Sequence, residues 1–87
     1  MSRQRTMEKI LASEYVTIGE LARLTGCRYS TLKFYTEEGM LPFEQAEQNL
    51  TRRYRQSESV KRVEWIRVQR ETGKTIPEIR KMLEAGL

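Results

Sequence analysis

TIGELARLTGCRYSTLKFYTEEG, residues 17–39, predicts two short helices joined by a tight turn. Thr17 and Glu20 have the spacing of a capping box, which begins the first helix. Gly26 stands where that helix would end in the left-handed conformation, and Gly39 closes the second helix. Two helices at a sharp angle, the second with polar and cationic residues at its start, can place side chains against base edges in a major groove. The segment therefore predicts a helix-turn-helix and indicates DNA binding.

The second predicted helix would supply both core and surface. Leu32 and either Tyr35 or Phe34 are expected to face inward. Cys27 lies between the helices and is interpreted as a small apolar residue packed beneath the turn, with a redox-sensing thiol as the alternative. The candidate contacts to DNA in this helix are Arg28, Tyr29 and Ser30 in the first turn and Lys33 one turn later.

Composition bounds the function classes. Eighty-seven residues allow one small domain, with a core too small for a large buried catalytic cavity. Sixteen Lys and Arg against twelve acidic residues give a net charge of +4, and no residue is histidine. The lack of histidine excludes a Cys/His zinc site and Cys–His nucleophilic catalysis. We therefore expect a protein that is not an enzyme and that uses no metal or cofactor.

The same sequence argues against a membrane partner. No apolar run approaches the roughly 20 residues that a membrane-spanning helix needs. The single cysteine cannot form an internal disulfide, which is typical of a reduced compartment. A cytoplasmic protein is expected.

A wing is predicted after the second helix. Pro42 ends the helical pattern, because proline disfavours helix in the residue before it. The simplest interpretation is a β-hairpin with one strand near Leu41–Phe43 and a return strand near Arg52–Tyr54. Arg52, Arg53 and Tyr54 lie in the densest cationic segment of the chain, and Arg and Tyr are side chains that contact phosphates. A solvated run of charge is the alternative, but the position directly after a helix-turn-helix favours a DNA-contacting wing.

Two further helices are predicted from residue 57 onward. The first begins with an N-cap at Ser57 and ends near Gly73. The second begins with a capping box formed by Thr75 and Glu78. Lys74 lies in the loop between them and is a further candidate contact to DNA. The expected core residues of these helices are Val60, Val63, Trp65, Ile66, Ile79, Met82 and Leu83.

From Val16 to Leu87 the chain resembles the N-terminal DNA-binding domain of MerR-type transcription regulators. The residues that carry the resemblance are, in order, Thr17-Ile-Gly-Glu-Leu-Ala, Thr31-Leu-Lys-Phe-Tyr35 with Gly39 and Leu41, Arg52-Arg-Tyr54, and the segment from Gly73 to Leu83. The resemblance implies a mostly α, winged helix-turn-helix fold with a small β-hairpin wing and a second, helical wing. It also implies that the second helix enters the major groove and that four matching residues hold the DNA: Lys33, Tyr35, Arg53 and Tyr54.

Three positions depart from the family pattern. Lys33 stands where the family usually has Arg, so a bidentate contact becomes a point-charge contact. Arg28 stands where a capping Ser or Asn is frequent, which removes a cap and adds a cation facing the groove. Leu50 replaces the usual Gly of the wing tip.

The expected function is sequence-specific binding of double-stranded DNA by a transcription regulator. Two alternatives stay open: an excisionase-like or partition-like architectural DNA-binding protein of a mobile element, and a protein-interaction module that has lost DNA binding. Residues 16–87 are expected to form the winged domain, without the long dimerisation helix and effector region of typical family members. The chain is then either a truncated domain or a naturally minimal regulator. No small-molecule inducer site is therefore expected within this chain.

Residues 1–15 are expected to form an N-terminal extension with a helix from about Thr6 to Ser13. Met7, Ile10 and Leu11 give this helix a small apolar face. The face could pack on its own domain or against a second copy, and the sequence does not choose between these. Self-association, as a dimer or as a cooperative multimer on DNA, is expected because a single recognition helix reads few base pairs.

Overall fold

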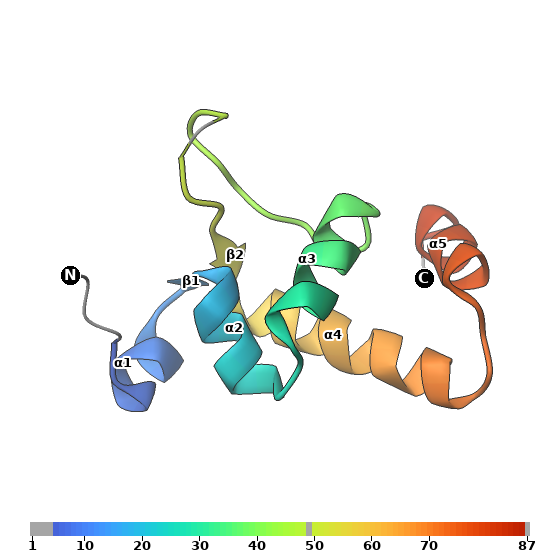
Figure 1. Ribbon diagram of the computed structural model, residues 1–87, viewed down its shortest axis with the longest axis horizontal. Coiled ribbons are helices and arrows are strands. Elements are labelled where there is room, and N and C mark those ends of the chain that lie inside the picture. The colour runs from blue at the N-terminus through green and yellow to red at the C-terminus, as the bar shows by residue number, and fades with distance from the viewer. Residues whose placement is uncertain (1–4, 49, 87) are drawn as a thin grey trace.

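The structure is a computed structural model that describes residues 5–48 and 50–86. Within these residues the order is α1 (Met7–Ala12), β1 (Tyr15–Val16), α2 (Ile18–Thr25), α3 (Tyr29–Glu37), β2 (Tyr54–Arg55), α4 (Gln56–Glu71) and α5 (Ile76–Glu84). The longest helix, α4, runs beneath α2 and α3 (Figure 1). In the same view α3 lies between the loop that precedes β2 and the last helix, α5. None of the described helices combines the length and the apolarity needed to cross a membrane.

The predicted helix-turn-helix is confirmed. The Thr17 hydroxyl accepts from the Glu20 N–H at 3.2 Å, and the Glu20 carboxylate accepts from the Thr17 N–H at 2.9 Å, which completes the capping box of α2. Gly26 ends α2 with a φ of 73°, in the left-handed region where glycine is favoured. The chain then turns directly into α3, so three residues separate the two helices.

The two-stranded sheet differs from the predicted hairpin. β2 pairs antiparallel with β1, in the register Tyr15 with Arg55 and Val16 with Tyr54. The expected strand at Leu41–Phe43 is wrong: Leu41 is buried in the core, and Pro42 has no N–H to donate to a ladder. The hairpin is reduced to one antiparallel bridge, in which the N–H groups of Glu44 and Arg53 donate to each other's carbonyls at 2.7 and 2.8 Å.

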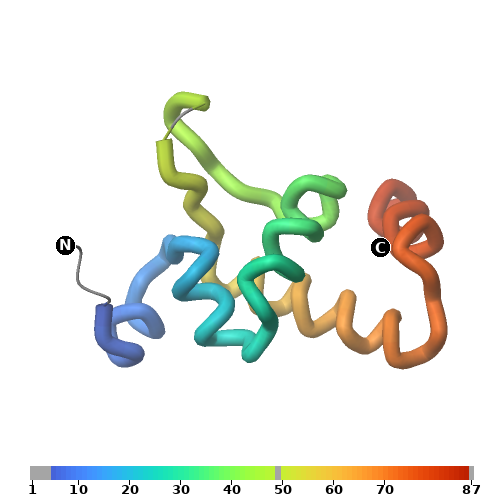
Figure 2. Tube along the Cα trace, in the orientation of Figure 1, coloured from blue at the N-terminus to red at the C-terminus, as the bar shows by residue number. Residues whose placement is uncertain are grey.

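This bridge closes the base of the wing, which we define as residues 42–48 and 50–53. Figure 2 shows the chain leaving α3, passing out through this loop and returning to the start of α4. The wing therefore projects beside α3, as the fold class requires.

The core has two parts. The larger cluster of buried residues draws on every element except α5, and it contains Ile10, Val16, Leu21, Leu32, Leu41, Tyr54 and Val63. The smaller cluster joins α5 to the rest, and it contains Met40, Ile66 and Ile79. Tyr35 packs against both clusters, so this residue of α3 links the two. Trp65 and Leu83 pack on the smaller cluster as expected.

The boundaries of the last two helices follow local hydrogen bonding. The predicted N-cap at Ser57 is wrong, because β2 runs directly into α4 and Arg55 occupies the cap position without a capping bond from its side chain. The N–H of Gln56 donates instead to the Glu14 carbonyl at 2.8 Å, which satisfies one end group of the helix. Gly73, with a φ of 92°, follows α4 as predicted, and the Thr75 capping box at the start of α5 is confirmed.

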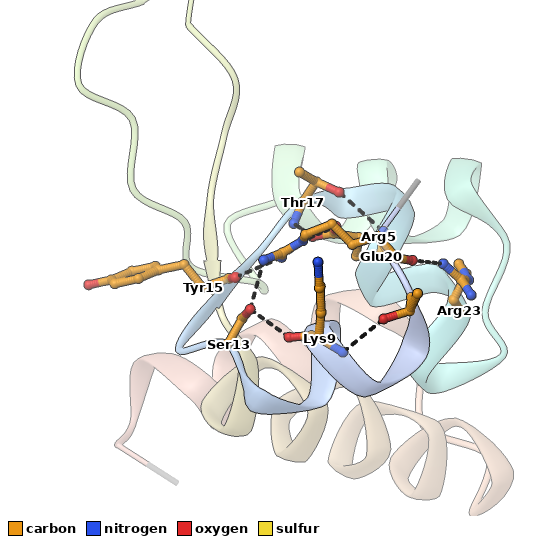
Figure 3. A network of polar contacts seen from close by, with 8 residues as sticks. Arg5, Lys9, Ser13, Tyr15, Thr17, Glu20 and Arg23 are labelled. Carbon is orange, nitrogen blue, oxygen red and sulfur yellow. Dashed lines mark hydrogen bonds and ion pairs between the residues drawn. The ribbon is translucent and has the colours of Figure 1, made fainter. Parts of the chain in front are cut away.

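The described part of the N-terminal extension is bound to the winged domain. Ile10 of α1 is fully buried in the larger cluster. Arg5 forms a two-pronged ion pair with Glu20, in which Nε and Nη2 each lie 2.6 Å from a carboxylate oxygen, and it also donates to Ser13 Oγ at 2.7 Å (Figure 3). The sequence left open whether the apolar face of α1 packs on its own domain or against a second copy, and Ile10 packs on its own domain. Met7 and Leu11 remain exposed on α1.

Candidate nucleic-acid interface

One side of α3 faces solvent. Leu32 and Thr36 are buried and Tyr35 is half-buried, which fixes the inward side of the helix. Successive residues of an α-helix are rotated by about 100°, so the opposite side is occupied by residues near Phe34. The side chains on the exposed side are Tyr29, Ser30, Lys33, Phe34 and Glu37. The choice between Tyr35 and Phe34 is thereby settled: Tyr35 faces inward and Phe34 outward.

The first turn of α3 is open. Its N-cap residue, Arg28, makes no capping hydrogen bond with its side chain, in agreement with the departure noted in the sequence. Arg28, Tyr29 and Ser30 are all exposed. The first N–H groups of a helix and the positive end of its dipole favour an anion such as phosphate. The cationic side chain of Arg28 adds to that field, so this end of α3 suits the DNA backbone or an acceptor on a base edge.

The base of the wing is held by Glu44. Its carboxylate accepts from the Tyr15 hydroxyl at 3.0 Å and from Arg55 Nε at 3.2 Å. The hydrogen bond to Glu44 is the main reason that the pKa of Tyr15 is raised above its ordinary value. Arg53, which is bridged to Glu44 through the backbone, presents an exposed side chain. Glu44 thus fixes the segment from which Arg53 extends.

Arg52, the other cation of the wing, is held against an aromatic ring. Its guanidinium lies 4.7 Å from the centre of the Phe43 ring. A cation over an aromatic face at this distance is attracted by the ring electrons, and the guanidinium edge stays available for hydrogen bonds. This contact reduces the freedom of the Arg52 side chain and gives the wing a positioned cation.

Tyr54 does not occupy the surface position that the sequence suggested. Its side chain is 0% exposed, and its hydroxyl lies 2.9 Å from Thr36 Oγ1. The Thr36 hydroxyl donates to the Leu32 carbonyl at 2.8 Å, so Tyr54 is the donor in its bond to Thr36. The expectation that the Tyr54 side chain contacts DNA is therefore wrong in this structure. The residue instead links β2, at the foot of the wing, to the inner side of α3.

Tyr35 occupies an intermediate position. It is half-buried, and burial is the main reason that its pKa is raised above the ordinary tyrosine value. Its ring lies between the two core clusters. Part of the side chain stays accessible, so the expected DNA contact of Tyr35 stays a prediction.

Salt bridges engage some cations of the described residues and leave the candidate DNA contacts free. Within residues 5–48 and 50–86, salt bridges engage Arg5, Arg55, Arg67 and Arg80 with glutamates. Over the same residues, these salt bridges include none of the five candidate cations, which are Arg28, Lys33, Arg52, Arg53 and Lys74. The five candidate cations are thus free of salt bridges. Among the described residues the same holds for Lys9, Arg23, Lys61, Arg62, Arg70 and Lys81.

Lys74 lies at the far end of α4 from the wing. Its half-buried side chain belongs to the loop before α5, and its N–H donates to the Gln69 carbonyl at 3.1 Å. A helix of sixteen residues is about 24 Å long. Figure 1 shows the wing and the loop between α4 and α5 on opposite sides of α3. The candidate residues therefore form a central helix face with a flank at each side.

Cys27 packs at the turn, as the sequence indicated. It is half-buried against the larger core cluster. Arg67 of α4 donates to the Thr25 carbonyl at 2.7 Å and contacts Cys27 Sγ at 3.1 Å. These bonds join α4 to the turn and hold the angle between α2 and α3.

The family and the relatives of the chain agree with this geometry. A family model described as MerR HTH family regulatory protein matches residues 16–86. The chain is 39% identical over 64 residues to a protein from Chromobacterium violaceum named HTH-type transcriptional activator SoxR homolog. The aligned region covers 74% of this chain and 42% of that protein. The chain is also 43% identical over 67 residues to the nodulation protein NolA of Bradyrhizobium elkanii, and the aligned region covers 77% of this chain and 30% of that protein. The matched region thus spans less than half the length of either relative, and no solved structure matches the chain significantly.

Proposed function

The chain belongs to the MerR HTH family of regulatory proteins, and from this premise we propose that it binds double-stranded DNA, with α3 in the major groove, and regulates transcription. Such a regulator would act in the cytoplasm and would carry out no catalysis of its own. The two relatives named above are a transcriptional activator homologue and a nodulation protein, which supports a regulatory role without fixing its direction.

The observation that carries the proposal is the distribution of unpaired cations around α3. Arg28 is the N-cap of α3, Lys33 lies on α3, Arg52 and Arg53 belong to the wing, and Lys74 belongs to the loop between α4 and α5. Figure 1 shows the wing and this loop on opposite sides of α3. Duplex DNA presents its phosphates on both sides of the major groove, and Lys and Arg are the side chains that neutralise them. A helix face flanked by cations on each side fits a groove flanked by two phosphate rows.

The residues then take two kinds of role. Arg28, Tyr29 and Ser30, in the open first turn of α3, are placed to reach base edges. Lys33, Arg52, Arg53 and Lys74 are assigned to phosphates, and the accessible part of Tyr35 is assigned to the DNA backbone as well. Tyr54 is assigned no contact and acts by positioning α3 against the foot of the wing.

Self-association is part of the proposal. One recognition helix reads only a few base pairs, so a regulator gains specificity by binding as two or more copies. The exposed apolar side chains of α1, Met7 and Leu11, are the candidates for contact between copies, with Leu11 57% exposed. Ile10 belongs to the core of its own domain and is not available for this contact.

Binding to duplexes selected from a random DNA pool tests the proposal. Lys33→Ala and Arg53→Ala should each weaken binding about ten- to hundredfold, because a hydrogen bond to a charged group contributes about 1.5–3 kcal/mol. Lys61→Ala is the matched control, since Lys61 is exposed on α4, on the side opposite the buried Val63. It should bind like the wild type. If the wild type retains no duplex, or if all three variants bind alike, the proposal fails.

A further inference from the structure

Phe34 is the one side chain of the exposed α3 face that carries no hydrogen-bonding group. It is 44% exposed and lies directly opposite the buried side of the helix. Ser30 stands one turn before it and Glu37 one turn after it, so the three form a ridge along the middle of the face. Tyr29 and Lys33 lie to one side of this ridge.

Packing in the core does not explain the outward position of the Phe34 ring. Its centre lies 6.2 Å from the ring of Tyr35, at a tilt of 55°, and Tyr35 is the residue that packs into both core clusters. Phe34 is a member of neither cluster among the described residues. Isolated exposed apolar residues are common on protein surfaces. This one differs by its place at the centre of the face assigned above to the major groove.

The chemistry of the groove limits what a phenyl ring can contact there. Base pairs present donors and acceptors in the major groove, and the thymine 5-methyl group is the apolar feature among them. A phenyl ring set against a cytosine would instead cover its N4 amino group without accepting its hydrogen bond, which costs free energy. The ring therefore distinguishes thymine from cytosine.

We propose that Phe34 is a specificity-determining residue that packs on the 5-methyl group of a thymine and so adds one thymine to the preferred DNA sequence. The proposal rests on the proposed function and deepens it, since the cations supply affinity for any duplex whereas Phe34 selects a base. It assigns to Phe34 a contact different in kind from those of Lys33 and Arg53.

Replacing thymine by uracil removes only the methyl group and keeps the base pair. In a duplex selected by the wild type from a random pool, each thymine is replaced in turn by deoxyuridine, and the dissociation constant is measured by fluorescence anisotropy. Burial of one methyl group contributes about 0.8 kcal/mol, so one position should bind about fourfold more weakly as uracil. The other positions should change less than twofold.

The variants Phe34→Ala and Phe34→Leu complete the test. The alanine variant should bind the thymine and uracil duplexes equally, whereas the leucine variant should keep part of the preference because it keeps an apolar contact. Val68→Ala, which removes another exposed apolar side chain on α4, should keep the full preference.

The outcomes separate this inference from the proposed function. If the wild type binds selected duplexes but discriminates uracil from thymine nowhere, the inference is overturned and the proposed function stands. A preference of equal size in Phe34→Ala also overturns it, because another residue then reads the methyl group. If no duplex is retained by the wild type, the proposed function itself fails.

Discussion

Replacement of Glu20 by Gln isolates the ion pair that fastens the N-terminal extension to α2. The Glu20 carboxylate accepts from two nitrogens of Arg5 at 2.6 Å and from the Thr17 N–H at 2.9 Å (Figure 3). Gln is accepted at this position of a capping box, so Glu20→Gln keeps the bond to Thr17 and removes the negative charge. The variant therefore measures the contribution of Arg5 to the stability of the helix-turn-helix.

The size of the effect follows from the pKa of Glu20. The hydrogen bonds from Arg5 are the largest cause of its fall from 4.5 to about 2. Each pKa unit corresponds to about 1.36 kcal/mol, so the difference between the two values sets a ceiling of about 3 kcal/mol. The Arg5 side chain is 39% exposed and water screens the pair, so we expect Glu20→Gln to lower the free energy of unfolding by about 1–2 kcal/mol at pH 7.

The effect should depend on pH with a definite sign. Folding lowers the pKa of Glu20, so its stabilisation is fully present above about 4.5 and is lost as the pH falls toward about 2. Urea unfolding of the wild type and of Glu20→Gln at pH 7, 4.5, 3 and 2 should show a difference in unfolding free energy that is constant down to about pH 4.5 and small at pH 2.

Glu78→Gln provides the matched control. Glu78 forms the same capping box on α5, accepting from the Thr75 N–H at 2.9 Å, and within the described residues it belongs to no salt bridge. This variant should change the unfolding free energy less than Glu20→Gln does at pH 7. A Glu20→Gln variant as stable as the wild type at pH 7, or a difference that persists unchanged to pH 2, would refute the reasoning.

Three further outcomes are expected. Tyr54→Phe should lower the free energy of unfolding by about 1 kcal/mol, because it removes the buried hydrogen bond to Thr36. The DNA affinity of the folded variant should stay within about twofold of the wild type. A large loss of affinity at unchanged stability would instead indicate that Tyr54 contacts DNA. In selections from a random pool, Arg28→Ala should alter the consensus at one or two positions by about 1–3 kcal/mol, whereas Arg53→Ala should weaken all sequences alike, and the reverse pattern would exchange their roles. Leu11→Gln should reduce self-association in sedimentation with DNA, and unchanged assembly would exclude this face as the contact between copies.

The helix-turn-helix could be predicted from sequence because its signals are local. The capping box of Thr17 and Glu20 and the glycine at position 26 act within a few residues of where they stand. Such signals need no knowledge of distant partners, and their predictions were confirmed. The capping box at Thr75 and the stop at Gly73 succeeded for the same reason.

The wing and the α4 boundary depended on distant partners. The return strand pairs with Tyr15–Val16, which lies nearly forty residues earlier, and this pairing also replaces a side-chain cap at the start of α4. This dependence on distant partners affects the prediction of site residues, as Tyr54 shows. Tyr54 directly follows Arg52 and Arg53 in the sequence, but the alternation of side chains along the strand and its hydrogen bond to Thr36 place it in the core. Neither fact can be read from the residues next to it.

The extension also depended on a contact that periodicity does not reveal. The apolar spacing of Met7, Ile10 and Leu11 predicted a face but not its partner. The structure divides this face, since Ile10 enters the core while Leu11 stays exposed. Arg5, which belongs to no sequence motif, makes a salt bridge to Glu20 that is the shortest among the described residues, at 2.6 Å. Because Ile10 is part of the core, deletion of residues 1–14 should destabilise the winged domain rather than leave it intact.

The dependence of DNA affinity on salt tests the central claim most directly. Each phosphate neutralised by a cation contributes a slope of about −0.9 to the plot of log K against log salt concentration. The four cations assigned to phosphates, which are Lys33, Arg52, Arg53 and Lys74, therefore predict a slope of about −4 per bound protomer. A slope near −4 for the wild type that becomes less steep by about 1 in Arg53→Ala, and stays unchanged in Lys61→Ala, is the predicted result. A slope near zero would contradict the assignment of these residues to DNA.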